Sequence, residues 1–225
     1  MTTRSPSLKV SRPRPRVARA ALRDGVREAI YQRILRSGLE PGRSIGEIAL
    51  GHELGASRTP LREALIELQS EGVLEHDPGR GFVVRPLSAS ELREIYPIVA
   101  ALDSLAMELA PKASATLTTR LRAINARFRA ASRAQRVALD TEWHDTLASG
   151  ANDRLSAMLR TLRRVIQRYE RAYMSDETLV RRSAREHETI AAALARGDRA
   201  GAARRLREHW NSSIERLIAL LETSR

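Results

Sequence analysis

Three histidines and one aspartate in the second half of the chain have a spacing that could bring them around a metal ion. Asp140 and His144 are four residues apart, so both project from one face if the segment is helical. His187 and His209 follow singly, each inside a helical pattern. A carboxylate and three imidazoles suit divalent zinc, nickel, manganese or iron and leave positions open for water or a ligand. The alternative is that each histidine is an ordinary surface or hydrogen-bonded core residue.

A second group of residues could contact nucleic acid. Arg58 and Arg62 share a face beside an apolar stripe formed by Leu61, Ala64, Leu65 and Leu68. Guanidinium groups at the start of a helix can bind guanine with two hydrogen bonds or clamp a phosphate. Gly55 predicts a left-handed turn before this helix, and Ser57 predicts a side-chain cap at its start. Periodicity alone fits equally an amphipathic helix with a solvated charged face.

The elements around these arginines form a recognisable order. Helical spacing predicts a first helix over 20–36 and a short second helix near 45–54, before the arginine-bearing helix. Two β-prone runs, 73–75 and 81–84, flank a Pro-Gly turn and predict a hairpin with Arg80 at its tip. Three helices followed by a hairpin predict a winged helix-turn-helix over 20–87. A simple surface turn is the alternative for the hairpin tip.

Residues 88–225 show helical patterns and no convincing strand. The patterns fall at 90–110, 116–131, 137–149, 152–174, 177–195 and 198–222, with breaks between them. Six such segments with short connections predict an all-α antiparallel bundle. The expected fold class is therefore mainly α, with a winged helix-turn-helix followed by a helical bundle.

Charge and composition limit the other possibilities. The net charge is +12, and residues 1–20 contribute six positive charges with no acid. We expect a disordered basic tail over 1–19 that either contacts phosphates or only aids solubility. The chain has no cysteine, which excludes disulfides and thiolate metal sites. Neither a signal peptide nor a membrane-spanning run is evident, so we expect a cytoplasmic protein that does not enter a membrane.

The motifs together resemble the GntR family of bacterial transcription regulators. The resemblance rests on Gly38-Leu39-Glu40-Pro41-Gly42, on Leu54-Gly55-Ala56-Ser57-Arg58-Thr59-Pro60-Leu61-Arg62-Glu63-Ala64-Leu65, on Glu71-Gly72-Val73-Leu74 and on Gly79-Arg80-Gly81-Phe82-Val83-Val84. It implies a homodimer that binds a double-stranded DNA operator and responds to a small molecule. Most relatives repress, so the resemblance implies a repressor. By the same resemblance, Arg58 and Arg62 contact bases or phosphates, Thr59 contacts a phosphate, and Gly81 with Arg80 belongs to the wing.

The helical second half looks like the effector-binding domain of the FadR-like branch of that family. Metal-binding members of the branch carry an Asp-x-x-x-His pair and then single histidines on two later helices. The match at Asp140, His144, His187 and His209 implies a divalent metal site with an effector beside it, and an organic acid is the expected effector. Relatives often have an arginine early in the first helix of this half, but residues 96–103 have none. Arg160, Arg163, Arg164 or Arg168 on a later helix could substitute, and Arg163 and Arg164 are the expected pair; the alternative is that these arginines form a solvated face.

Two other functions remain open at this stage. Three nitrogens, a carboxylate and open coordination positions could activate water, as in a metal-dependent hydrolase. This interpretation leaves the arginine-bearing helix unexplained. The chain could also be a constitutive architectural DNA-binding protein whose helical half only dimerises. A ligand-dependent change in operator binding would distinguish the three functions, and the leading interpretation is a regulator without enzymatic activity.

Overall fold

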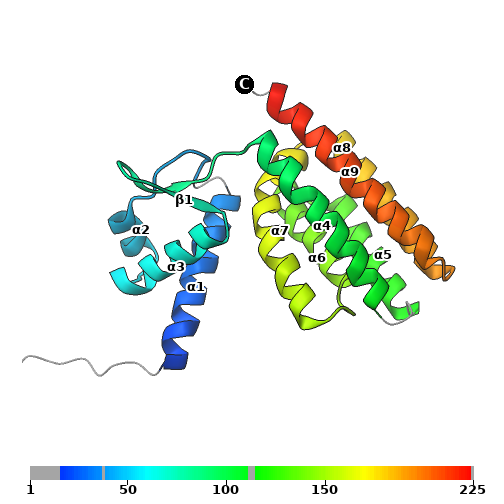
Figure 1. Cartoon of the computed structure of the whole chain (residues 1–225), viewed down its shortest axis with the longest axis horizontal. Helices are drawn as coiled ribbons and strands as arrows, with labels where there is room; N and C mark the ends of the chain where they lie inside the picture. Colours follow the sequence, from blue (N-terminus) through cyan, green and yellow to red (C-terminus); the bar gives the residue numbers. More distant parts are fainter. Residues whose placement is uncertain (1–15, 37–38, 111–114, 224–225) are drawn as a thin grey trace, which may run out of the picture.

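The computed structural model describes residues 16–36, 39–110 and 115–223. These residues form a small winged helix-turn-helix and a larger helical bundle, joined by an extended stretch between them (Figure 1). The mainly α fold class predicted from the sequence is confirmed. None of the helices in the described ranges is both long enough and apolar enough to cross a membrane.

The N-terminal part contains three helices and one hairpin. Their bounds are α1 Arg16–Leu35, α2 Glu47–Glu53, α3 Arg58–Ser70, β1 Leu74–Asp77 and β2 Gly81–Val84. The predicted tail over 1–19 was too long, because residues 16–19 belong to α1. The residues that directly follow Pro15 are mostly good helix formers such as alanine, leucine and arginine, so the helix begins immediately after it. The rest of the predicted tail lies outside the described residues.

The turn before α3 is only partly as predicted. Gly55 has φ +60°, the left-handed conformation that separates α2 from α3. Ser57 occupies the N-cap position, but its side chain caps no backbone N–H group, contrary to the prediction. The apolar stripe of α3 is buried against α1, and its members are Leu61, Ala64, Leu65 and Leu68. This packing leaves the opposite face of α3 exposed.

The wing has a third, very short strand partner that the sequence analysis missed. Ser44 forms an isolated antiparallel bridge with Val83, next to the β1–β2 pairing. The backbone N–H of Ile45 donates to Phe82 at 2.8 Å, and that of Val84 donates to Arg43 at 2.9 Å. The segment before α2 is therefore bound to the hairpin, which holds the wing against the three helices.

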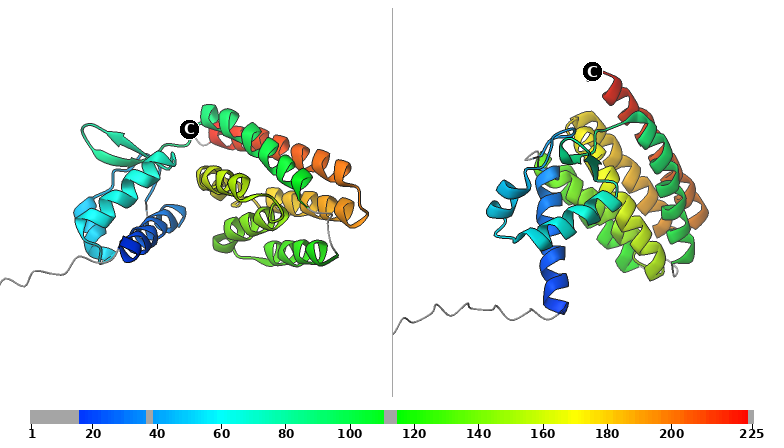
Figure 2. Two further views of the ribbon diagram at one scale, coloured as in Figure 1. Left: turned by 60° about the horizontal axis from the view of Figure 1, so that its bottom comes forward. Right: turned by 60° about the vertical axis from the view of Figure 1, so that its left-hand side comes forward.

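Six helices form the C-terminal bundle as a ring, with one further helix–helix contact across it. Their bounds are α4 Ala89–Leu109, α5 Ala115–Ala130, α6 Arg133–Leu147, α7 Asp153–Tyr173, α8 Glu177–Ala195 and α9 Arg199–Thr223. The order around the ring is α4, α9, α8, α5, α6 and α7, and both views in Figure 2 show the helices side by side. All six predicted helices are present, and α6 begins four residues earlier than predicted.

The two parts are joined by contacts from α7. The buried guanidinium of Arg168 donates to the backbone oxygen of Arg85 at 2.7 Å and to the Glu91 carboxylate at 2.8 Å. The hydroxyl of Tyr31, in α1, donates to the backbone oxygen of Arg164 at 2.9 Å. Because these groups are largely buried, the two parts meet through specific polar contacts as well as through the connecting stretch.

Candidate functional site

The start of α3 presents the residues expected to contact DNA. Arg58, Thr59 and Arg62 are all exposed, and Arg58 and Arg62 are one turn apart. Within the described part of the chain neither arginine forms an ion pair. Both guanidinium groups are therefore available to an external anion or base, while the buried stripe behind them fixes the helix in place.

Arg80, at the tip of the wing, is held by an ion pair, unlike Arg58 and Arg62 of α3. The Nε and Nη2 of Arg80 lie 2.9 and 2.8 Å from the Asp77 carboxylate. The hydrogen bond from Arg80, together with the backbone N–H of Gly79, holds the pKa of Asp77 below its usual value. Gly81 follows with φ +74°, where a side chain would be strained. Arg80 is thus positioned by its own loop, in contrast to the two arginines of α3.

The three histidines of the bundle meet at its centre, although they come from three different helices. His144 lies on α6, His187 on α8 and His209 on α9, and one nitrogen from each lies within 4.8 Å of the others. All three are buried. Asp140 reaches the same point: its oxygens lie 3.6 Å from Nε2 of His187 and 3.9 Å from Nε2 of His144. The structure therefore brings the four predicted ligands together.

Two further acids, which the sequence analysis missed, support this cluster from outside. Asp103 of α4 places Oδ2 3.3 Å from Nδ1 of His144. Glu186 of α8 places Oε2 2.8 Å from Nδ1 of His209. Burial alone would raise the pKa of Glu186, but its bonds to His209 and Arg182 lower it to about 2. Each carboxylate can accept a hydrogen bond from Nδ1–H, which would leave Nε2 of the same ring free to bind a metal.

Several buried nitrogen and oxygen atoms at the centre of the histidine cluster lack the hydrogen-bond partners that buried polar atoms normally have. Within the described residues Nε2 of His144, both ring nitrogens of His187 and Oδ1 of Asp140 make no hydrogen bond, although they are buried. Orphaned polar groups are costly in a core. Burial and the two neighbouring histidines also hold the pKa of His187 well below its usual value, so this ring is neutral, as a ligand must be. The donor set thus fits a metal ion.

Trp143 fixes the ring plane of His187, one of the candidate ligands. Its ring stacks on His187 with centroids 3.9 Å apart and an angle of 9° between the planes. The sequence analysis gave Trp143 no role, since the residue precedes His144 but belongs to a different face of α6. Stacking holds the His187 ring without using either of its nitrogens, which remain free for other contacts.

The two arginines expected to bind an effector lie in different places. Arg163 is buried and pairs with Asp103 and Asp145, so its guanidinium supports the acid behind His144. Arg164 donates to Glu28 of α1 at 2.9 Å and lies over the Tyr31 ring. Consecutive residues on a helix point about 100° apart, and here this separation divides the pair between the cluster and the junction with α1.

A small polar cavity lies directly beside the histidines. It has a volume of about 10 Å³ and is lined by Tyr96, Asp140, Glu170, Tyr173, Ser183, His209 and Ser213, among others. That volume holds about one water molecule. Burial and the nearby Asp140 raise the pKa of Glu170 well above its usual value. A ligand larger than water would need these side chains to move apart.

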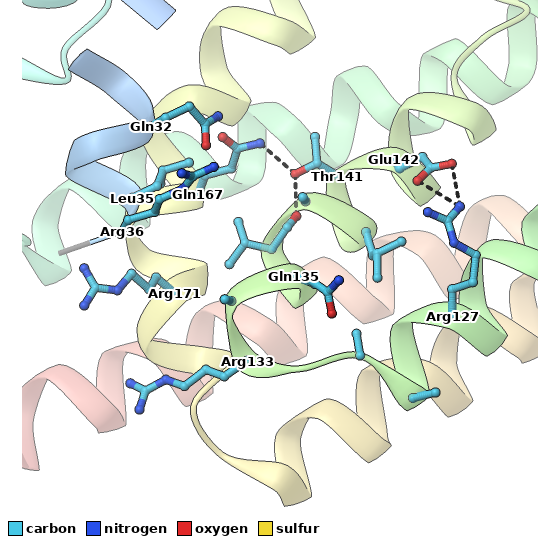
Figure 3. A pocket seen from close by; sticks show the side chains of 16 residues that line it. Gln32, Leu35, Arg36, Arg127, Arg133, Gln135, Thr141, Glu142, Gln167 and Arg171 are labelled. Atoms are coloured by element: carbon cyan, nitrogen blue, oxygen red, sulfur yellow. Dashed lines mark hydrogen bonds and ion pairs between the residues drawn. The ribbon is translucent and has the colours of Figure 1, made fainter. Parts of the chain in front are cut away.

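A much larger pocket, of about 1110 Å³, lies at the junction between α1 and the bundle (Figure 3). Gln32, Leu35 and Arg36 of α1 line one side of it. Helices α5, α6 and α7 supply the rest, including Arg133, Arg171, Gln167 and the ion pair between Arg127 and Glu142. None of the four predicted metal ligands lines this pocket, so it and the histidine cluster are separate features.

Comparison with protein-family models accounts for both halves of the chain. Residues 22–84 match the model of bacterial regulatory proteins of the gntR family. Residues 94–212, just over half of the chain, match the FCD domain. The chain is a GntR-family protein with an FCD domain. The resemblance noted from the motifs is thereby confirmed at the level of the family, and FCD domains are known for metal binding.

Curated transcription regulators are similar to part of the chain. The Nta operon transcriptional regulator of Aminobacter aminovorans is 44% identical over 70 residues, which cover 31% of this chain and 33% of the relative. The probable D-xylose utilization operon transcriptional repressor of Paenarthrobacter nicotinovorans is 37% identical over 95 residues, or 42% of each chain. The chain thus spans between about a third and a half of the length of the curated relatives that it matches.

Solved structures of GntR-family proteins share the whole fold. Escherichia coli McbR/YncC superposes with a TM-score of 0.77 at 22% identity, covering 88% of this chain and 97% of that one. A putative GntR regulator from Rhodococcus sp. RHA1 gives a TM-score of 0.76 at 18% identity, covering 90% and 98%. Identities this low support a common fold and carry no information about ligands.

Proposed function

We propose that this protein is a ligand-responsive transcription regulator, a repressor by default, whose bundle binds a divalent metal and a small effector beside it. The N-terminal part would bind a double-stranded DNA operator through Arg58, Thr59 and Arg62, with Arg80 and Gly81 in the wing. The metal ligands would be Asp140, His144, His187 and His209. The protein would act as a homodimer, because inverted-repeat operators match two-fold symmetric proteins.

One observation carries the proposal: four buried candidate ligands from three helices converge, and polar atoms of three of them, Asp140, His144 and His187, lack hydrogen-bond partners within the described residues. A bound metal would supply the missing partner and a positive charge at the centre of the bundle. Asp103 and Glu186 would hold two of the rings in the required tautomer. The donor set suits zinc, nickel, manganese or iron without selecting one of them.

The effector would bind through the metal and the polar cavity beside it. A carboxylate or hydroxyl oxygen is the kind of group that completes such a coordination sphere. Arg163 would act indirectly, by holding Asp103, and Arg164 would act at the junction with α1. Because the cavity has room for about one water molecule, effector binding would require α7 and α9 to shift, and α7 also contacts the DNA-binding part.

The test uses the full-length protein and its own operator, found by footprinting on genomic DNA. Metal-loaded and chelator-treated protein would be compared in mobility-shift titrations, with and without a panel of mono-, di- and tricarboxylates. The variant His187→Ala/His209→Ala should lose stoichiometric metal in elemental analysis and lose the carboxylate response, while still binding the operator. A matched control is His76→Ala, since His76 is an exposed histidine of the hairpin.

Each other outcome identifies a different function. Full metal occupancy in the double variant would refute the metal site, and a normal carboxylate response in metal-free protein would refute its role. Operator binding that no metal or carboxylate changes would indicate a constitutive DNA-binding protein. Metal-dependent hydrolysis of added esters without sequence-specific DNA binding would indicate the hydrolase alternative.

A further inference from the structure

The pocket between α1 and the bundle carries an excess of positive charge. Its lining includes one acid, Glu142, and four arginines: Arg36, Arg127, Arg133 and Arg171. The acid already pairs with Arg127 at 3.1 Å, so four positive charges and one negative charge leave the lining at +3. At about 1110 Å³, the pocket has room for a small organic molecule. The charge of the lining indicates that such a molecule would be an anion.

Three of these arginines come from different elements and lie on the same side of the pocket. Arg36 follows the end of α1, Arg133 is the first residue of α6, and Arg171 lies in the last turn of α7. Figure 3 shows them opposite the pair formed by Arg127 and Glu142. Within the described ranges, the exposed side chains of Arg36 and Arg133 form no ion pair or hydrogen bond. Both guanidinium groups can therefore bind the oxygens of an external anion.

The rest of the lining suits the uncharged body of a ligand. Amide and hydroxyl groups, which can both donate and accept hydrogen bonds, come from Gln32, Gln135, Gln167 and Thr141. Small and branched apolar side chains supply the remaining surface, and they belong to Leu35, Ala130, Ala131, Ala134, Val137, Ala138 and Leu139. The pocket thus combines a charged side with an apolar wall, as sites for small organic molecules commonly do.

The size of the charge excess favours phosphate over a single carboxylate. A phosphate monoester carries about −1.5 to −2 charges near neutral pH and offers three acceptor oxygens. A carboxylate carries one charge and offers two oxygens. A lining with three surplus positive charges is therefore neutralised better by a ligand with one or more phosphate groups.

We propose that this pocket binds an organic phosphate. Its phosphate groups lie against Arg36, Arg133 and Arg171, and its uncharged body lies along the apolar wall. This site goes beyond the proposed metal and effector site, because none of the four proposed metal ligands lines it.

A ligand in this pocket would contact both parts of the protein. Arg36 follows α1 of the DNA-binding part, whereas Arg133 and Arg171 belong to the bundle. The pocket also adjoins an existing contact between the two parts, because the hydroxyl of Tyr31 bonds to the side chain of Gln167, which lines the pocket. Binding would therefore stabilise the arrangement of the two parts in which α1 and α7 are in contact.

Isothermal titration calorimetry of the full chain, without DNA or added metal, tests the site with ATP as the probe. The wild type should bind one ATP per chain, and Arg36→Ala/Arg133→Ala should raise the dissociation constant by at least about tenfold. The control Arg154→Ala/Arg160→Ala removes the same charge from exposed positions of α7 outside the pocket, and it should bind ATP like the wild type. No ATP binding to the wild type, or equal losses in both double variants, would overturn the proposal.

A second variant keeps the test valid if the double substitution disturbs the fold. Ala134→Glu places a negative charge in the pocket, at an exposed position in the first turn of α6, where an acid favours the helix. It should also weaken ATP binding by at least about tenfold, with helical content retained in circular dichroism. Unchanged affinity in this folded variant would refute the site.

Further titrations separate this pocket from the other candidate sites. Arg58→Ala/Arg62→Ala and His187→Ala/His209→Ala should both bind ATP like the wild type, because neither pair of residues lines the pocket. Loss of ATP binding in the α3 variant would place the phosphate on the DNA-binding helix and refute the proposal. Retained binding in the histidine variant would support it whether or not the metal site exists, and loss there would refute it.

Simpler probes test the class of ligand. Pyrophosphate should bind more weakly than ATP, because it lacks the body that lies along the apolar wall. Adenosine should bind at least about tenfold more weakly than ATP, because it lacks the phosphates. Citrate, a tricarboxylate, serves as the comparison anion. Citrate or adenosine that binds as tightly as ATP would refute the assignment to organic phosphates.

Discussion

Asp103 and His144 lie on different helices, yet Oδ2 of the aspartate is 3.3 Å from Nδ1 of the histidine. The same carboxylate accepts a hydrogen bond from the indole N–H of Trp210 at 3.1 Å and pairs with Arg163. Burial alone would raise the pKa of Asp103, but the positive charge of Arg163 and the bond to His144 hold it below its usual value. An ionised carboxylate behind His144 orients that ring so that its Nε2 faces the other candidate ligands.

Replacing Asp103 with asparagine should weaken metal binding without abolishing it. The amide keeps the shape of the side chain but loses the charge that supports His144, and such supporting groups contribute about 10–100-fold to metal affinity. Competition with a zinc chelator would measure the change. The control is Asp145→Asn, because Asp145 also pairs with Arg163 but its side chain is half-exposed and does not contact the histidines. Equal affinities for wild type and Asp103→Asn would show that the contact has no part in metal binding.

Replacing Arg58 or Arg62 with alanine should weaken operator binding by about 1–3 kcal/mol each. Both guanidinium groups are exposed and form no ion pair within the described residues. Arg80→Ala should cost less, because Arg80 already pairs with Asp77. Fluorescence anisotropy with the footprinted operator would compare these variants with Arg160→Ala, which changes an exposed arginine of the bundle. If Arg80→Ala had the largest effect, the wing and not α3 would dominate recognition.

Removal of residues 1–15 should lower affinity for all DNA sequences and leave the preferred site unchanged. This segment holds four basic residues and no acid, and charge of this kind binds phosphates without reading bases. The slope of log affinity against log salt should fall by up to about four per chain, because each neutralised phosphate contributes about 0.9. An unchanged slope would indicate that the tail only aids solubility. Residues 16–19 are kept in this variant because they belong to α1.

Replacing Arg168 with alanine should loosen the connection between the DNA-binding part and the bundle. The substitution removes the hydrogen bonds to the backbone oxygens of Arg85 and Val73 and the buried partner of Glu91. Loss of one member of a buried pair should lower the free energy of unfolding by about 3 kcal/mol. Calorimetry should show a lower unfolding temperature than in the control Arg160→Ala, and two separate unfolding transitions in place of one. A single transition at the wild-type temperature would contradict this role.

Local patterns in the sequence were sufficient for the elements and for the shared helix face of Asp140 and His144. Helical periodicity and the breaks between periodic segments predicted all six helices of the bundle, since both depend on residues a few positions apart. The four-residue spacing of Asp140 and His144 follows from the helical repeat alone. Their convergence with His187 and His209 was expected from the family resemblance, and the structure places the four side chains together.

Contacts between distant segments were decided only by the tertiary structure. Asp103 and Glu186 sit in ordinary helical patterns, and their support of His144 and His209 depends on how α4, α8 and α9 pack against their neighbours. The division of Arg163 and Arg164 between the cluster and α1 depends on the rotation of α7 about its own axis. A sequence pattern specifies which face of a helix is apolar, but the polar group that meets each side chain is set by the helix packed against it.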